Sequence, residues 1–390
     1  MSGWELRDKV AIVGVGETEY TRWGRATKSE LSLALEAIIN AANDAGIPVD
    51  ELDGFASYAT ERQVPATLAS ALGVKQLRYE GLHWGGGGGG APGGAMMAML
   101  AVATGSADYV VAYRSLAQGQ FGRFGQSRAG AGQVVGGEPA FMAPYGLVTP
   151  PQTFAMQARR HMHEYGTTSL QMGAVAVASY KHAQTNPRAV MYGRPITIED
   201  HQSSRMIADP YRLYDCCQET DGACAVILTT VERARDLKQK PITIMSASQG
   251  ASYRGAAWGH NWPEYPSAAF RSVASDLYDR AGVGPKDIDV AQIYENFTGM
   301  VIMSLEDHGF CDIGEGGPFV EGGRIEIGGE LPLNTSGGNL AEAYIHGFEL
   351  VVEGVRQLRG SSTCQVPDAE ICLVAGGPGV SPCSDLILRR

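Results

Sequence analysis

The sequence predicts a layered α/β protein assembled from two similar halves. Short apolar runs alternate with helix-like stretches near the N-terminus, which is the pattern of strands and helices that pack in layers. Two strings from this region recur in the same order near the C-terminus, which indicates a duplication. The 390 residues, of which 44% are hydrophobic, are enough for two to three domains of roughly 100–200 residues each.

The N-terminal region is predicted to run strand, helix, strand. Residues 10–15 form a short apolar run, and Thr27-Lys28-Ser29-Glu30 has the pattern of a capping box that opens a helix. Gly46 is expected to end this helix, and residues 53–58 to continue as a strand. A second helix and strand are expected at 91–113. The apolar stripe of the first helix is predicted to contain Leu31, Ala34, Leu35, Ile38, Ile39 and Ala42.

The internal repeat carries the prediction of a duplication. AGIPVDELDGFASY, which begins at Ala45, aligns without gaps on AGVGPKDIDVAQIY, which begins at Ala281. A second pair of strings follows in the same order, DYVVAY from Asp108 and EICLVA from Glu370. Two matches in one order favour duplication over chance. The identical pairs of the first alignment are Ala45/Ala281, Gly46/Gly282, Asp53/Asp289 and Tyr58/Tyr294.

These copies divide the chain into three regions. We expect an N-terminal half at 1–113, with its last strands at about 221–235, and a C-terminal half at 236–390. Residues 114–220 lie between the halves and form a helical, loop-rich insertion.

Charge, hydropathy and cysteine content exclude several classes of protein. A net charge of −11 argues against a broad nucleic-acid-binding face, since phosphate affinity comes mainly from clustered Lys and Arg. No apolar run approaches the length of a membrane span, and the first residues lack the pattern of a secretory leader, so we expect a cytoplasmic protein without membrane contact. The seven cysteines form no CxxC pair and no Cys/His ladder, which argues against a disulfide framework or a zinc site.

Two weaker patterns allow other interpretations. VGVGETEY resembles part of a dinucleotide fingerprint, but Glu19 stands where the third glycine is needed. His161 and His163 are spaced like metal ligands, yet without a third nearby ligand we assign them to a solvated helix face and its inner edge.

Longer strings resemble the thiolase superfamily, in its sterol-carrier or lipid-transfer branch. They are VAIVGVGETEY at the start, HEYGTTSLQMGAVAVASYKHAQTNPRA, SSRMIADPYRLYDCCQETDGACAVIL, YENFTG and NTSGGNLAEAYIHG. These strings cover most of the chain and follow the order of the family. The resemblance implies a thiolase fold, five-layered αβαβα from two duplicated halves with a helical loop insertion, and usually a dimer.

The same resemblance implies that the thiolase nucleophile is missing. Thiolases carry a reactive Cys at a helix N-terminus, where the helix dipole lowers the thiol pKa. The matching stretch, LHWGGGGGGAPGGAMMAML, places Gly90 or a neighbouring glycine at that position. Both histidine motifs are changed as well. Tyr294 of YENF stands where the branch has His, and counting on from NTSGG places Tyr344 at the second His, with His346 two residues beyond.

A site of this kind can still stabilise a thioester enolate, because glycine N–H groups approach a thioester oxygen closely. Retro-aldol cleavage needs this plus a base and an acid. The ordinary pKa of tyrosine is ~10, so one tyrosine must have a lowered pKa or act with a partner. The candidates for catalysis are Tyr294 and Tyr344, with His346, Glu295 and Asn296 as partners. The candidates for substrate binding are Gly89, Gly90, Gly377, Gly379 and His260, the last in an aromatic-rich loop.

The resemblance is strongest to the lipid-transfer-protein type of aldolase in bacterial steroid side-chain degradation. It implies cleavage of a 17-hydroxy steroid C22-CoA thioester to a 17-keto steroid and propionyl-CoA, without a cofactor. It also implies a DUF35, OB-fold protein partner and a heterotetramer with it. Three alternatives stay open: an acyl-CoA acyltransferase with another nucleophile, a non-catalytic lipid or acyl-CoA carrier or scaffold, and a nicotinamide-dependent dehydrogenase.

Overall fold

The computed structural model describes residues 4–84, 87–121, 138–251 and 264–390. Its strands are β1 (Val10–Glu17), β2 (Thr21–Arg22), β3 (Gly54–Tyr58), β4 (Tyr79–His83), β5 (Val110–Leu116), β6 (Met206–Ala208), β7 (Tyr211–Arg212), β8 (Thr220–Thr230), β9 (Ile242–Gly250), β10 (Val290–Ile293), β11 (Ile371–Gly376) and β12 (Cys383–Arg389). Its α-helices are α1 (Glu30–Ala45), α2 (Pro65–Leu72), α3 (Gly90–Ala103), α4 (Gln118–Phe121), α5 (Pro150–Tyr165), α6 (Ser169–Ala183), α7 (Ile198–Ser203), α8 (Val231–Ala234), α9 (Arg271–Ala281), α10 (Thr298–Asp307), α11 (Gly316–Phe319), α12 (Gly338–Ala341) and α13 (Phe348–Arg359).

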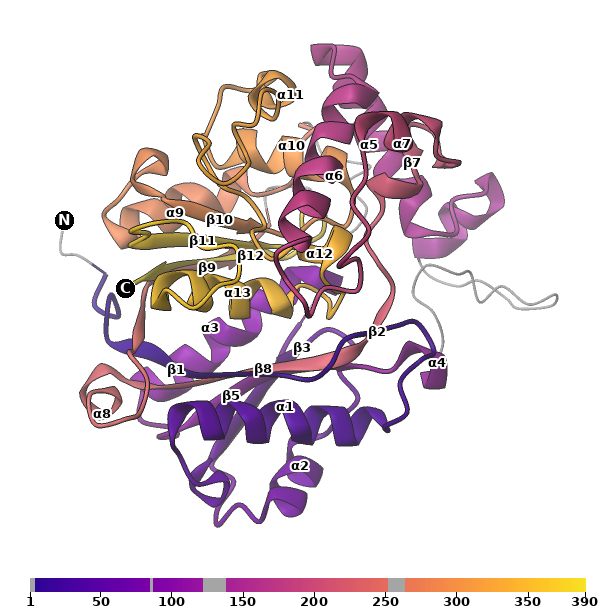
Figure 1. The fold of residues 1–390 in the computed structure, drawn as a ribbon. Helices are drawn as coiled ribbons and strands as arrows, with labels where there is room; N and C mark the ends of the chain where they lie inside the picture. Colours follow the sequence, from indigo (N-terminus) through magenta and orange to yellow (C-terminus); the bar gives the residue numbers. More distant parts are fainter. Residues whose placement is uncertain (1–3, 85–86, 122–137, 252–263) are drawn as a thin grey trace.

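The elements stack in five layers, as the sequence predicts (Figure 1). Helices α1 and α2 cover the outer face of the N-terminal sheet, and α9 and α10 cover that of the C-terminal sheet. Helices α3 and α13 lie between the two sheets. The stretch GAPGGAMMAMLAVA of α3 is apolar on all sides, which suits a helix enclosed by protein. None of the helices in the described ranges is long and apolar enough to cross a membrane.

The strand order repeats in the two halves. In the N-terminal half, β3 pairs in parallel with β5, and β8 lies antiparallel between β5 and β1. In the C-terminal half, β10 pairs in parallel with β11, and β12 lies antiparallel between β11 and β9. A short antiparallel contact of β1 with β9 joins the halves into one ten-stranded sheet. The shared order confirms the duplicated α/β halves.

The repeated strings also make the same contacts. The carboxylate of Asp53 accepts the backbone N–H of Asp108 at 2.9 and 3.0 Å. The carboxylate of Asp289 accepts the backbone N–H of Glu370 at 2.9 Å. Each aspartate therefore ties the start of one parallel strand to the start of its neighbour, and the two alignments found in the sequence correspond to one structural unit used twice.

Helix α1 differs from its prediction at the N-terminus. The N-cap is Ser29 and not Thr27, because the Ser29 hydroxyl accepts the N–H of Ser32 at 3.1 Å. The Glu30 carboxylate does not reach back to the chain as in a capping box, since it binds Arg62 at 2.8 Å. The predicted apolar stripe is also partly wrong, because Ile39 is 39% exposed. Leu33, Ala37 and Ala41 are buried in its place.

The glycines of VGVGETEY let β1 lie against α1. A Cβ atom on Gly14 would lie 2.2 Å from the carbonyl oxygen of Ala41, and one on Gly16 would lie 2.1 Å from that of Ala37. Only glycine permits this approach of strand and helix. Close packing of β1 on α1 therefore explains these glycines, and a nucleotide-binding site is not needed to account for them.

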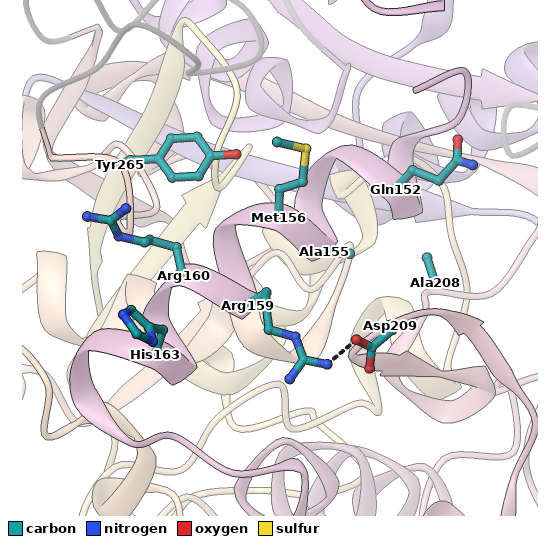
Figure 2. A pocket seen from close by; sticks show the side chains of 9 residues that line it. All are labelled: Gln152, Ala155, Met156, Arg159, Arg160, His163, Ala208, Asp209 and Tyr265. Carbon is teal, nitrogen blue, oxygen red and sulfur yellow. Dashed lines mark hydrogen bonds and ion pairs between the residues drawn. The ribbon is translucent and has the colours of Figure 1, made fainter. Parts of the chain in front are cut away.

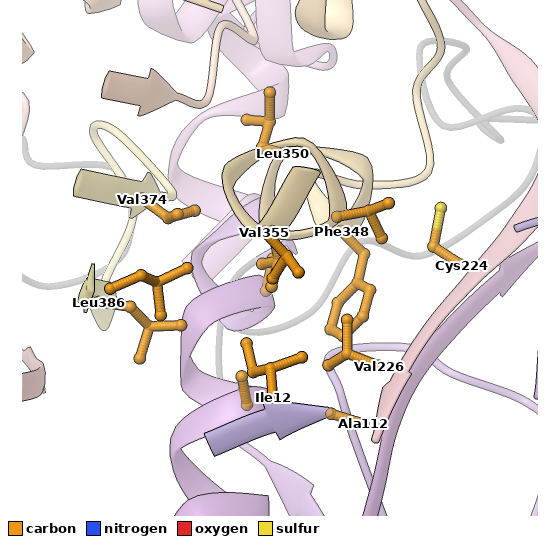
Figure 3. Packing of buried hydrophobic residues seen from close by; sticks show 14 of the residues in the cluster. Ile12, Ala112, Cys224, Val226, Phe348, Leu350, Val355, Val374 and Leu386 are labelled. Carbon is orange, nitrogen blue, oxygen red and sulfur yellow. The ribbon is translucent and has the colours of Figure 1, made fainter. Parts of the chain in front are cut away.

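One apolar core spans the boundary between the halves (Figure 3). Side chains of both sheets meet α13 in this core, where Phe348 points toward the N-terminal sheet. The residues labelled in the figure are Ile12, Ala112, Cys224, Val226, Phe348, Leu350, Val355, Val374 and Leu386. Because close-packed interiors resist deformation, this core fixes the loops of one half relative to the other. The middle segment packs its own apolar residues, such as Phe154 and Met172, into the core of the C-terminal half.

Candidate active site

A cavity of about 1320 Å³ opens at the carboxyl ends of the strands, between the two halves and the middle segment. The loops that follow β3, β4, β10 and β11 line it, and α5 closes one side. Ligands of layered α/β proteins bind at this end of the strands. Of the predicted site residues, the cavity is lined by Tyr294, Asn296, Tyr344, His346 and Gly377.

The two tyrosines meet at the wall of this cavity. Tyr294 follows β10, and Tyr344 lies in the loop between α12 and α13. The hydroxyl of Tyr294 donates to that of Tyr344, with the oxygens 3.0 Å apart. The side chains are 3% and 8% exposed, so both are almost fully shielded from solvent. The structure thus brings together the two positions that the family motifs single out.

Both phenols are neutral in the free protein. Burial raises the pKa of Tyr294 well above its ordinary value, and Tyr344 adds to this shift. Burial likewise raises the pKa of Tyr344, although the hydrogen bond from Tyr294 opposes the shift. Of the two alternatives drawn from the sequence, the raised pKa values contradict a lowered tyrosine pKa, because within the described residues the charge of Arg114 does not outweigh the loss of water around Tyr344. The alternative that remains is that one tyrosine acts together with a partner residue.

The glycine run places Gly88, not Gly90, opposite the tyrosines. A Cβ atom on Gly88 would lie 2.2 Å from the ring of Tyr294. A Cβ atom on Gly90 would instead lie 2.4 Å from Tyr58. The ring of Tyr294 therefore occupies the space into which a side chain at position 88 would point. No nucleophilic side chain fits there while this ring is in place.

Gly89, Gly90 and Gly379 do not line the cavity. Gly89 and Gly90 are buried and Gly379 is half-buried, because the first turn of α3 packs against the loop after β11. A Cβ atom on Gly377 would lie 2.1 Å from the Cα of Gly89. Gly379 faces Met300, Phe154 and the amide oxygen of Gln157. Among the glycines predicted to bind substrate, Gly377 alone lines the cavity within the described ranges, and its neighbours support the loop from below.

His346 is held by the N-terminal half. Its backbone φ of 58° is in the left-handed region, which is uncommon for a residue other than glycine. The hydroxyl of Tyr58 donates to the carbonyl oxygen of His346 at 3.0 Å. Nη2 of Arg114 lies 3.1 Å from its Nδ1. Burial and the charge of Arg114 lower the pKa of His346 well below its ordinary value, so the ring is neutral.

Glu295 and Asn296 point in different directions. Asn296 lines the cavity, and its amide nitrogen donates to the carbonyl oxygen of Pro378 at 3.4 Å. Glu295 is fully buried away from the cavity, with its carboxyl against Gly338. Its oxygens make no hydrogen bond of regular geometry within the described residues, and burial raises its pKa to about 8. The structure does not bring Glu295 to the tyrosines.

Other predicted residues lie elsewhere. His260 is outside the described residues. His161 is buried between Thr167 and Glu306 and His163 is exposed, so one of the two lies on the inner side of the helix and the other on its solvated face. Within the described ranges, no group of three or more His, Cys, Asp or Glu side chains is arranged to hold a metal ion.

The mouth of the cavity carries arginine side chains that were not predicted from the sequence. Arg22, Arg25 and Arg205 are exposed and line the cavity. No ion pair joins them to another residue in the described parts of the chain. Trp23, Trp84 and Glu219 also line the cavity, so its lining combines aromatic side chains with three arginines and one carboxylate. Because these residues are far apart in the sequence, no local pattern indicates them.

A second, smaller cavity of about 550 Å³ is lined by side chains of α5 together with Ala208, Asp209 and Tyr265 (Figure 2). Arg159 in this cavity points toward Asp209 and forms an ion pair with it. Arg160 forms an ion pair with Glu164 in the next turn of the helix. Neither tyrosine of the larger cavity reaches this one, so we place the chemistry in the larger cavity.

Comparisons with known proteins identify the family that this chain resembles. Residues 257–388 match the family described as "Thiolase C-terminal domain-like". The chain is 44% identical to "17-hydroxy-3-oxo-4-pregnene-20-carboxyl-CoA lyase" of Mycobacterium tuberculosis, over 98% of this chain and 100% of that one. It is 43% identical to "Steroid side-chain-cleaving aldolase" of Thermomonospora curvata, over 98% of each chain. The solved structure "Ltp2-ChsH2(DUF35) aldolase" superposes with a TM-score of 0.91 at 41% identity and covers 98% of each chain.

Proposed function

This chain belongs to the thiolase-fold family of steroid side-chain-cleaving aldolases and is a lyase, not a cysteine-dependent thiolase, and we propose that it cleaves a 17-hydroxy steroid C22-CoA thioester by a retro-aldol reaction. The products are a 17-keto steroid and propionyl-CoA. One observation in the site supports the proposal. A hydrogen-bonded tyrosine pair lies where a nucleophile would be, and the ring of Tyr294 leaves no room for a side chain at Gly88.

The neutral tyrosine pair suits the proton balance of this reaction. Retro-aldol cleavage removes one proton from the β-hydroxyl oxygen and adds one to the Cα atom of the leaving thioester. One phenol of the pair accepts the hydroxyl proton as the Cα–Cβ bond breaks, while the pair delivers another proton to Cα. Tyr294 and Tyr344 are then neutral before and after, which is consistent with their raised pKa values. The hydrogen bond between the two hydroxyls permits proton transfer from Tyr294 to Tyr344 or in the reverse direction.

The three arginines at the mouth supply a place for the CoA phosphates. Arg22, Arg25 and Arg205 present guanidinium groups, which bind phosphate through paired hydrogen bonds. The cavity of about 1320 Å³ exceeds the roughly 300–1000 Å³ of ordinary ligand pockets. A steroid with a pantetheine arm needs such room, with the steroid rings inside and the nucleotide at the entrance.

The assembly is proposed from the matched complex. The name of that solved structure pairs the aldolase with a DUF35 protein, and we propose a homodimer of this chain bound to an OB-fold partner of that kind. Strand β4 ends the sheet, and no other described strand pairs with its outer side, which leaves an edge for a second copy. All seven cysteines are free thiols, which suits a reducing cytoplasm.

Cavity cysteines do not offer a substitute nucleophile. Cys216 and Cys217 both line the cavity. Burial raises the pKa of Cys216 to about 12 and that of Cys217 well above its ordinary value. Because the thiolate is the reactive form, these thiols argue against an acyltransferase with a different nucleophile. A carrier would not require the buried tyrosine pair.

The test is a coupled assay of wild type, Tyr294→Phe and Tyr344→Phe, each purified with its OB-fold partner. Propionyl-CoA released from the 17-hydroxy steroid C22-CoA thioester is followed. Tyr180→Phe is the matched control, because Tyr180 also lines the cavity but binds Gln218 instead of the pair. Loss of release in the first two variants alone supports the proposal. Equal release from all four removes the tyrosines from the mechanism, and no release from wild type points to another acyl-CoA or to a carrier.

A further inference from the structure

Arg114 makes a contact that fixes the proton of His346. Arg114 lies on β5 and is fully buried, and its Nη2 is 3.1 Å from Nδ1 of His346. A guanidinium group has only donors and stays protonated. Nδ1 must therefore accept, and the proton of the neutral imidazole ring must be on Nε2. The contact with Arg114 therefore assigns the tautomer of His346, because the guanidinium group can only donate. A distance to a partner that could also accept would not assign it.

The surroundings of Arg114 keep this contact in place. Its Nη1 lies 3.5 Å from the Glu61 carboxylate, and Nη2 also donates to Thr60 at 3.3 Å. The guanidinium carbon lies 5.2 Å from the centre of the Tyr58 ring. Of the groups that face His346, Arg114 is the only cation within the described residues, while Tyr58 and Tyr344 contact it as aromatic rings. A second positive charge on His346 would oppose that of Arg114.

The backbone directs Nε2 toward the glycine loop of the cavity. The φ of 58° at His346 is unfavourable for a residue other than glycine and persists only where contacts hold it. Tyr58 provides such a contact through the carbonyl oxygen of His346. Nε2 lies 3.2 Å from the position of a Cβ atom on Gly87, and both residues line the cavity. The donor atom of His346 therefore faces the same space as the tyrosine pair.

We infer that Arg114 is a positioning residue that holds His346 as an Nε2–H hydrogen-bond donor to the thioester oxygen of the substrate. This inference rests on the proposed function. When the Cα–Cβ bond breaks, its electron pair moves into the enolate, and negative charge develops on the thioester oxygen. His346 stabilises that charge without giving up its proton, since the proton balance is already complete within the tyrosine pair. A preorganised donor of this kind is worth about 10²–10³ in kcat.

The tautomer is tested without any substrate. The full chain in complex with its partner is labelled with ¹⁵N-histidine, and the resonances of His346 are assigned by their absence in His346→Gln. We expect an unprotonated Nδ1 and a protonated Nε2 that stay unchanged through pH 6.5, the ordinary histidine pKa. A protonated Nδ1, or a ring that titrates near that pH, overturns the inference.

The role as donor is tested by amide substitutions. The Gln amide nitrogen matches Nε2 of histidine in reach, whereas the Asn amide nitrogen matches Nδ1. We expect His346→Gln to keep kcat within about tenfold of wild type, and His346→Asn and His346→Leu to lose about 10²–10³ with little change in KM. A Gln variant as slow as the Leu variant overturns the donor role, because Gln retains a neutral donor and loses only the ability to titrate.

The role of Arg114 is tested by combining variants. Arg114→Met is measured in the wild-type and His346→Gln backgrounds, and Arg114→Met/Glu61→Gln is added so that no unpaired carboxylate stays buried. In the wild-type background we expect Arg114→Met to lower kcat and to add a fall in rate at acidic pH. In the His346→Gln background we expect a much smaller loss of kcat. Equal losses in both backgrounds would show a purely structural role. If wild type releases no propionyl-CoA, the proposed function fails, while the NMR measurement still decides the tautomer.

Discussion

The hydroxyl oxygens of Tyr294 and Tyr344 lie 3.0 Å apart, although 50 positions separate the residues in the chain. Tyr294 ends the second copy of the internal repeat, and Tyr58 ends the first. Each of these repeat tyrosines binds the loop before α13, Tyr294 at the Tyr344 hydroxyl and Tyr58 at the His346 carbonyl. The duplication thus provides one tyrosine for the proposed proton relay and its counterpart for support of the same loop.

The pH dependence of kcat/KM distinguishes a neutral tyrosine pair from a phenolate. Burial raises the pKa of Tyr294 and Tyr344 above 10 and lowers that of His346 below 6.5. The neutral forms of all three are therefore retained between these pH values. We expect kcat/KM of the complex to be level across this range, since it reports groups of the free enzyme. A rate that rises steadily with pH in this range would show that a phenolate is the reactive form.

Substitution of Gly88 by Ala should disturb the tyrosine pair. The added Cβ atom would lie 2.2 Å from the Tyr294 ring, so the ring must move. We expect kcat to fall about 10²-fold, because a displacement of about 1 Å has that effect on a positioned group. Gly284→Ala is the control, since its φ is −125° and the nearest atom to an added Cβ, on Asp287, would be 3.9 Å away. Full activity of Gly88→Ala would contradict the placement of Tyr294.

The arginines at the mouth should govern the binding of CoA. We expect Arg22→Gln, Arg25→Gln and Arg205→Gln each to raise KM about tenfold with kcat nearly unchanged, because a charged hydrogen bond contributes about 1.5–3 kcal/mol. The effect should shrink at high salt. Arg235→Gln, at an exposed position beyond α8, is the control. An unchanged KM in all three variants would place the phosphates elsewhere.

Glu295 should make the stability of the protein depend on pH. Its pKa is about 8 in the folded state, against 4.5 for an exposed glutamate, so the folded state binds the proton more tightly than the unfolded chain does. This contribution to stability is fully present below pH 4.5 and is lost as the pH rises through about 8. A pKa difference of one between the two states corresponds to about 1.4 kcal/mol, so the total amounts to a few kcal/mol.

We therefore expect Glu295→Gln to flatten the fall of the unfolding free energy between pH 5 and pH 8, and to raise Tm mainly at the alkaline end. Thermal unfolding of wild type, Glu295→Gln and the exposed control Glu232→Gln checks this. A larger stabilisation at the acidic end would contradict the raised pKa.

Several features of this protein follow from the sequence itself. The end of α1 at Gly46, the duplicated strand order and the absence of a thiol at the start of α3 are all visible as local strings. Local strings suffice because a helix end, a strand and a missing nucleophile depend on residues that are near neighbours in the chain. The tyrosine positions followed from the family motifs for the same reason.

Other features were decided by the tertiary structure alone. Glu295 and Asn296 are adjacent in the chain, yet one is buried beside Gly338 and the other lines the cavity. Gly88 and not Gly90 faces the tyrosines, and Arg114 meets His346 across the boundary of the halves. Successive residues beyond a strand end point in different directions, and contacts between distant segments are set by how the layers pack. The sequence therefore determined which residues are available to the site, and packing determined which of them reach it.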